Sequence, residues 1–132
     1  MTEDNIQKVV MTWARWQPLA FIGIKGKLSD FIHHSPNGGY RSGREGKNFK
    51  LMGTKAGFPD LFLFIPKGEY HGLFIELKTP KGKTADGKTR RAGEVSDNQK
   101  VMIDRLNTVG YKAVVCYGYD EAIRAIKDYL SI

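Results

Sequence analysis

The stretches GFPDLFLFI at residues 57–65 and LFIELK at residues 73–78 decide the fold. Both are apolar runs rich in β-forming residues, and the segment 66–71 between them starts with Pro and contains Gly, so they predict a hairpin. Side chains alternate faces along a strand, which places Glu76 and Lys78 on one face and Leu77 on the other. Asp60, at the start of the first strand, then lies opposite the end of the second. We therefore expect Asp60, Glu76 and Lys78 to converge.

Two converging carboxylates form a hard oxygen site of the kind that Mg²⁺ prefers. Such an ion polarises a phosphodiester and lowers the pKa of a bound water, and a neighbouring lysine stabilises the charge that develops on the phosphate oxygens. An ordinary Glu/Lys pair on a solvated edge strand is the other interpretation, but Glu76 lies in a run too apolar for an exposed edge. The motif predicts a metal-dependent nuclease.

Charge is concentrated around this motif. The 132-residue chain has a formal net charge of +7, and residues 41–91 hold 12 Lys/Arg against 5 Asp/Glu, so the remainder of the chain is balanced. A basic surface around acidic ligands suits a protein that binds the phosphate backbone of nucleic acid. A charge that served only solubility would be more evenly spread.

The single cysteine, Cys116, excludes an intrachain disulfide and a cysteine-based zinc site, and is typical of a reducing compartment. No run approaches the roughly 18 apolar residues of a membrane span, and the polar N-terminus is unlike a secretory signal. We expect one domain over residues 1–132, in the cytoplasm.

Hydrophobic periodicity and turn residues outline the remaining elements. Residues 96–99 read as a capping box that opens a helix. We expect helices at 2–16, 96–109 and 120–130, strands at 31–34, 60–65, 72–78 and 111–117, a weakly helical basic segment at 40–56, and a flexible loop at 79–95. The predicted inward faces of the first two helices are Ile6, Val9, Val10, Trp13 and Trp16, and Val101, Met102, Leu106 and Val109. This order predicts an α/β fold with a mixed sheet flanked by helices.

Taken together, these motifs resemble the virus-type replication-repair nuclease (VRR-NUC) family of the PD-(D/E)XK superfamily, over nearly the whole chain. The resemblance rests on Glu3 with Gln7, Asn37-Gly38-Gly39 with Arg41, the GFPD at 57–60, Glu76-Leu77-Lys78, and Ser96 with Gln99. One departure is the connection of twenty residues between Lys78 and Gln99, which is longer and more basic than in compact members.

The resemblance implies a restriction-endonuclease-like fold and a set of site residues. Asp60, Glu76 and the Leu77 carbonyl would hold Mg²⁺, for which Mn²⁺ substitutes. Lys78 would be the catalytic lysine, Gln99 would complete the site, and Glu3 would be an additional acid from the first helix. From the residues alone, Glu3 also fits a first-turn acid favoured by the helix dipole, and Gln99 fits a simple capping residue.

The resemblance also implies a DNA endonuclease of replication, repair or recombination that selects branched DNA, as Holliday-junction resolvases do. Members consisting of this domain alone occur in phages and bacteria and form homodimers. We expect residues of the basic midsection to contact phosphates, although any single one of them could equally be a solvated loop residue. The candidates are Asn37, Arg41, Arg44, Lys47, Lys55, Lys81, Lys83, Lys88, Arg90 and Arg91.

Two other interpretations fit parts of the sequence. His33 and His34 suggest a ββα-metal nuclease, but the chain lacks the later helix and suitable histidine, and adjacent side chains on a strand face opposite ways. A basic module that binds nucleic acid without cleaving it would lose affinity by placing carboxylates in a phosphate-facing cleft. Trp13, Trp16 and Tyr40 could stack on bases, although Trp13 at helical spacing also fits the core.

Overall fold

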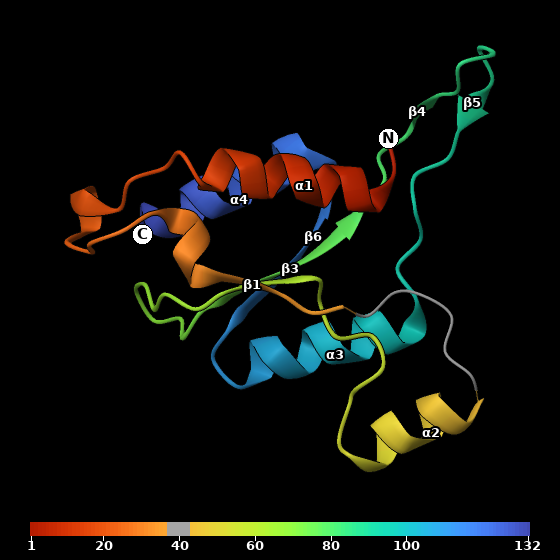
Figure 1. Cartoon of the computed structure of the whole chain (residues 1–132), viewed down its shortest axis with the longest axis horizontal. Coiled ribbons are helices and arrows are strands. Elements are labelled where there is room, and N and C mark those ends of the chain that lie inside the picture. The colour runs from red at the N-terminus through yellow and green to blue at the C-terminus, as the bar shows by residue number, and fades with distance from the viewer. Residues whose placement is uncertain (37–42) are drawn as a thin grey trace.

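The computed structural model describes residues 1–36 and 43–132, which fold around a four-stranded mixed sheet (Figure 1). Its strands are ordered β1 (Ile32–His34), β2 (Leu61–Leu63), β3 (Leu73–Lys78) and β6 (Lys112–Tyr117). β1 with β2 and β2 with β3 are antiparallel, whereas β3 with β6 is parallel. The pairing of Leu61 with Ile75 confirms the predicted hairpin, and the architecture confirms the predicted α/β class.

Helices cover both faces of this sheet. Figure 1 shows α1 (Glu3–Ala14) and α4 (Tyr119–Leu130) on one face and α3 (Asp97–Thr108) on the other, whereas α2 (Gly43–Leu51) stands away from the sheet. Two 3-10 turns, Ala20–Ile22 and Leu28–Phe31, connect α1 to β1. Within the described part of the chain, no helix combines the length and apolar character needed to cross a bilayer.

Strand β3 is buried along its whole length and divides the core in two. Leu73, Ile75 and Leu77 pack in the larger cluster with α1 and α4. Phe74 packs on the opposite face with Met102 and Leu106 of α3. Because side chains alternate, Glu76 and Lys78 continue the row begun by Phe74, so they point toward the α3 side of the sheet.

Three expectations about local structure are wrong. Val101 and Val109 are 46% and 61% exposed, because the stripe of α3 that faces the sheet runs through Met102 and Leu106. Trp16 is 77% exposed, because α1 ends at Ala14. Residues 79–95, predicted as a flexible loop, are not loop throughout: they contain a second, two-stranded sheet of β4 (Gly82–Lys83) and β5 (Thr89–Arg90).

Candidate active site

Three carboxylates from separate elements meet at one end of the sheet. Asp60 immediately precedes β2, Glu76 lies in β3, and Glu3 begins α1. One carboxylate oxygen from each of the three lies within 4.8 Å of the others. The convergence of Asp60 and Glu76 expected from the hairpin is therefore present in the structure, and Glu3 joins them from a helix more than fifty residues away in sequence.

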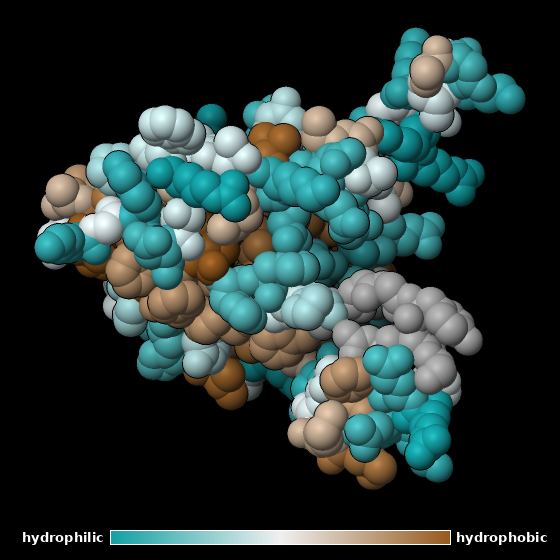
Figure 2. All heavy atoms as spheres, viewed as in Figure 1, coloured by the Kyte–Doolittle hydropathy of each residue, from teal (hydrophilic) through white to brown (hydrophobic). Residues whose placement is uncertain are grey.

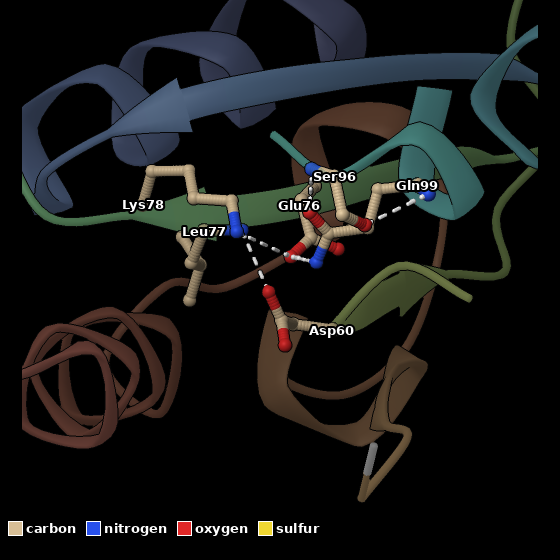
Figure 3. Close-up of polar contacts among 6 residues, drawn as sticks. All are labelled: Asp60, Glu76, Leu77, Lys78, Ser96 and Gln99. Atoms are coloured by element: carbon tan, nitrogen blue, oxygen red, sulfur yellow. Dashed lines mark hydrogen bonds and ion pairs between the residues drawn. The ribbon is translucent and has the colours of Figure 1, made fainter. Parts of the chain in front are cut away.

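The backbone of β3 holds Asp60 in place. Because β2 begins only at Leu61, opposite Ile75, the edge of β3 beyond this pair has no strand partner on the β2 side. The Leu77 amide donates a hydrogen bond of 2.7 Å to Oδ2 of Asp60, which substitutes a side chain for the missing strand (Figure 3). A carboxylate held by a backbone amide on a central strand has little freedom to move.

Glu76 and Lys78 form an ion pair inside the protein. Their side chains lie on the same face of β3, as predicted, and Lys78 Nζ is 3.8 Å from Glu76 Oε1. Glu76 is 2% exposed and Lys78 is 7% exposed. A pair buried this deeply costs desolvation free energy, so it is weak evidence for stability and points to another use.

Gln99 both caps α3 and contacts Glu76. Its side-chain Oε1 accepts a hydrogen bond from the backbone amide of Ser96 (2.9 Å), and its backbone amide donates to Ser96 Oγ (3.2 Å). Since Oε1 is committed to the cap, Nε2 is turned toward the site, where it donates to Glu76 Oε1 at 2.9 Å (Figure 3). The capping box thus fixes the orientation of the amide that contacts Glu76.

Gly57 sets the spacing between α3 and the segment that carries Asp60. Its φ is +75°, and a Cβ added there would lie 2.5 Å from the backbone carbon of Asn98 and 2.6 Å from the nitrogen of Gln99. Both the left-handed conformation and the contact require glycine. The GFPD motif therefore contributes an acid at one end and a packing contact against the first turn of α3 at the other.

The electrostatics of the cluster favour a bound cation. Burial, followed by the negative charge of Asp60, raises the pKa of Glu76 to about 8, although Lys78 acts in the opposite direction. Burial also raises the pKa of Glu3. Oε2 of Glu76 is buried and has no hydrogen-bond partner among the described residues. An oxygen left unpaired beside two further carboxylates fits a hard divalent ion such as Mg²⁺.

A cavity of about 340 Å³ opens onto two members of this cluster, Glu3 and Asp60. Sequence reasoning did not assign Asp4 or His34 to the site, yet both line the cavity. Nδ1 of His34 lies 3.1 Å from the Asp60 carbonyl, because the pairing of His34 with Leu61 brings the end of β1 beside Asp60. Only the strand order, which the sequence does not state, reveals this neighbour. The lining residues are Glu3, Asp4, Gln7, His34, Pro36, Asp60 and Leu77.

The predicted nucleic-acid contacts occupy two regions outside the cavity. Arg44, Lys47 and Lys55 are exposed in or just after α2, and Asn37, Tyr40 and Arg41 lie outside the described residues. Four cations of the 79–95 segment are also exposed: Lys81, Lys83, Lys88 and Arg91. The fifth, Arg90, is only partly exposed, and its guanidinium reaches the Pro80 carbonyl. Trp13 is half-buried and packs against the core.

Comparisons with known proteins give a family match and a similar solved structure. The family model described as the VRR-NUC domain matches residues 1–120. A solved structure described as "VRR_NUC domain protein" is 37% identical to this chain, with a TM-score of 0.77. That match covers 99% of this chain and 89% of the other. None of the curated proteins matches the chain.

Proposed function

The chain belongs to the VRR-NUC family of nuclease domains, and we propose that it is a divalent-metal-dependent endonuclease that cleaves branched DNA. One observation carries the metal-dependent part of this proposal. Three carboxylates from three elements meet within 4.8 Å beside a buried lysine. Without a cation the cluster must either bear its own repulsion or bind a proton, and the raised pKa of Glu76 shows this cost, so a purely structural purpose does not explain it.

We assign the metal to Asp60, Glu76 and the carbonyl of Leu77, with Mg²⁺ as the physiological ion and Mn²⁺ as its substitute. The N–H and C=O of one strand residue point to the same side, so the Leu77 carbonyl faces the same open edge as the amide that binds Asp60. When bound, the ion would polarise the scissile phosphodiester and lower the pKa of a coordinated water.

The remaining residues orient the reacting groups. Lys78 is placed to stabilise negative charge on the phosphate oxygens, because its ammonium is only 3.8 Å from Glu76 and is largely withdrawn from water. Gln99 keeps one oxygen of Glu76 engaged and so directs the other. Glu3 supplies a third carboxylate from the first turn of α1.

The finer parts of the proposal rest on the family. We propose selection of four-way junctions or other branched DNA in replication, repair or recombination, action as a homodimer, and a cytoplasmic location in a bacterium or phage host, with residues 1–132 as one domain. A small domain needs a second subunit to enlarge its footprint, and two-fold symmetry presents two sites to two strands. The lone Cys116, which is buried, is compatible with a reducing compartment.

The test compares cleavage with binding. Asp60→Asn removes one charge but keeps an oxygen that can accept from the Leu77 amide, and Lys78→Met keeps most of the side-chain volume. Both variants should lose Mg²⁺-dependent cleavage of a panel of junctions, flaps, splayed arms and nicked duplexes. Both should still bind these DNAs in Ca²⁺, because the exposed basic residues are unchanged.

The matched control is Lys100→Met. Lys100 lies next to Gln99 on the exposed surface of α3, and the Lys100→Met variant should cleave like the wild type. Wild-type rates from Asp60→Asn or Lys78→Met would reject the site assignment. A wild-type protein that binds the whole panel but cleaves none of it with Mg²⁺ or Mn²⁺ would favour the non-cleaving module instead.

A further inference from the structure

Residues 79–93, which we call the arm, leave the body of the protein and return to it at one narrow neck. β4 and β5 pair antiparallel, with Gly82 opposite Arg90 and Lys83 opposite Thr89. At the neck, the Gly93 amide donates to the Thr79 carbonyl at 2.9 Å, and the Arg90 guanidinium reaches the Pro80 carbonyl at 3.5 Å. Figure 1 shows the hairpin extending well beyond the sheet and its helices.

The tip of the arm is shaped by its own hydrogen bonds. The Thr84 amide donates to the Lys88 carbonyl (2.8 Å), the Gly87 amide donates to the Thr84 carbonyl (2.9 Å), and Gly87 has a φ of +83°. Asp86, the one acid of the arm, accepts hydrogen bonds from the Thr84 hydroxyl and the Lys88 backbone amide. None of residues 79–93, all of which the structure describes, is buried. The turn therefore presents cations without needing support from the core.

The cations of the arm have two different roles. Arg90 is partly buried and holds the neck together. Because consecutive cross-strand pairs alternate faces, Lys83 points to the face opposite that of Arg90. Four other cations, Lys81, Lys83, Lys88 and Arg91, are exposed. Figure 2 shows the projecting segment as mostly hydrophilic. A long, exposed ribbon of this charge fits an extended polyanion.

The neck of the arm is built into the candidate site. Lys78 immediately precedes it and Ser96 follows it, and a Cβ added to Gly93 would lie 3.3 Å from Cδ of Lys78. In Figure 1 the arm and α2 project on opposite sides of the same end of the molecule, the end where α1 begins and β3 finishes. The arm thus stands beside the acidic cavity. When a phosphate of the DNA lies in the cavity, the arm can contact a neighbouring part of the same DNA.

The chemistry of the arm favours double-stranded DNA as its partner. Proteins that grip single strands stack bases on aromatic side chains, and residues 79–93 contain no aromatic residue. A two-stranded ribbon fits a groove of a duplex, and duplex DNA carries one negative charge per ~1.7 Å of its axis.

We propose that the arm is a duplex clamp, which grips double-stranded DNA on one side of the phosphate that the candidate site cleaves. The substrate must therefore carry a duplex segment on that side. This inference rests on the proposed function for the position of the cleaved phosphate, but the clamp itself acts in binding.

The experiment uses two full-length triple variants that each remove three positive charges from a formal net charge of +7. The arm variant carries Lys81→Gln, Lys83→Gln and Lys88→Gln. The control carries Arg15→Gln, Lys25→Gln and Lys27→Gln, all exposed residues of the segment from the end of α1 to the second 3-10 turn. Dissociation constants are measured in Ca²⁺, without turnover, over a range of salt concentrations. The DNA is a junction with one branch extended stepwise, either as duplex or as single strand.

We expect duplex extension to raise the affinity of the wild type and of the control, and single-stranded extension to raise it much less. In the arm variant the gain from duplex extension should vanish. The slope of log K against log salt should become shallower by about 2 to 3, since each lost phosphate contact contributes about 0.9. The control should keep the wild-type slope.

Equal losses of slope in the two triple variants would overturn the clamp, as they would show only a diffuse charge effect. An equal gain from single-stranded extension would overturn it in favour of a single-strand partner, and a changed oligomeric state of the arm variant would overturn it in favour of a second copy of the chain. Failure of the proposed function is read separately. If the wild type cleaves no DNA with Mg²⁺ or Mn²⁺ while the arm still sets the slope, the nuclease proposal fails and the clamp stands.

Discussion

The acidic cavity and the basic periphery of this protein are built in opposite ways. Glu76 and Lys78 are buried in the central strand, and Asp60 and Gln99 are fixed by hydrogen bonds to Leu77 and Ser96. The arm and α2 contain no buried residue, and α2 stands away from the sheet. The positions of the proposed catalytic groups therefore depend on the packed core, whereas the charges that would meet DNA depend on it hardly at all.

This contrast has an energetic side. Burying like charges lowers the stability of the folded state, because desolvation and repulsion both oppose it. Exposed lysines and arginines cost little, since water solvates them in the folded and the unfolded chain alike. Substitutions that remove a buried charge of the site should therefore lower cleavage while raising the stability of the folded state. Substitutions of exposed charges should change DNA binding while leaving the stability nearly unchanged.

The largest effect should come from Glu76→Gln. The glutamine keeps an oxygen for the Gln99 amide but removes a buried carboxylate whose pKa is raised to about 8. We expect cleavage to fall on the order of 10³-fold or more, as when one preorganised electrostatic group is removed from a reaction site. At the same time, the melting temperature in EDTA at pH 8 should rise. Single-turnover cleavage and thermal unfolding of the same samples measure both.

The pH dependence of stability sharpens this prediction. The folded state holds a proton on Glu76 up to about pH 8, whereas the unfolded chain releases it near the ordinary value of 4.5. Between these values the unfolded state binds fewer protons, so the stability of the metal-free protein should fall as pH rises through this window. Glu76→Gln should flatten that fall. A variant whose stability tracks the wild type at every pH would show that Glu76 is ionised without cost.

A smaller effect should come from Gly57→Ala, with Gly23→Ala as its control. The two glycines have φ values of +75° and +76°, so alanine costs about 1 to 2 kcal/mol of conformational strain at either. Only Gly57 also lies against the backbone of Asn98 and Gln99; nothing lies within 4 Å of a Cβ at Gly23. Gly57→Ala should add about 1 to 3 kcal/mol of overpacking.

Cleavage distinguishes the two glycines more clearly than stability. Shifting the first turn of α3 displaces Gln99 relative to Glu76, and a misplacement of about 1 Å can cost ~10²-fold in rate. We expect this loss for Gly57→Ala, measured well below its melting temperature, with DNA binding in Ca²⁺ retained. Gly23→Ala should cleave normally. Equal rates for both variants would mean that the contact of Gly57 with α3 does not position the site.

The part of the site that lies along the chain was predictable from the sequence. Alternation along residues 73–78 placed Glu76 and Lys78 on one face, and the capping box located Gln99 in the first turn of its helix. These are short-range rules, because each concerns neighbours within one strand or one helical turn. The hairpin rule extended them to Asp60, since a single turn joins its two strands.

The sequence-based predictions that failed, or that were missing, concern contacts between elements. His34 reaches Asp60 only because β1 pairs with β2, and no pattern within residues 31–34 records that pairing. The hairpin of the arm escaped detection because Gly82, Lys83, Thr89 and Arg90 have no apolar alternation, which is the signal for a half-buried strand. Val101 and Val109 belong to an apolar stripe of α3, but the sheet meets the neighbouring stripe through Met102 and Leu106.

The smallest effect should come from Leu51→Ala at the end of α2, paired with Leu61→Ala in β2. Leu51 is 80% exposed and Leu61 is 2% exposed, so the same substitution is made in each region. We expect a change below ~0.5 kcal/mol in the free energy of unfolding at Leu51 and a loss of about 2 to 5 kcal/mol at Leu61. Urea unfolding of both variants, at a protein concentration where the oligomeric state is known, provides the comparison. A loss at Leu51 that disappears on dilution would show that α2 packs against a second copy of the chain. The periphery would then share in the core of an assembly, and the contrast between the two regions would hold only for the single subunit.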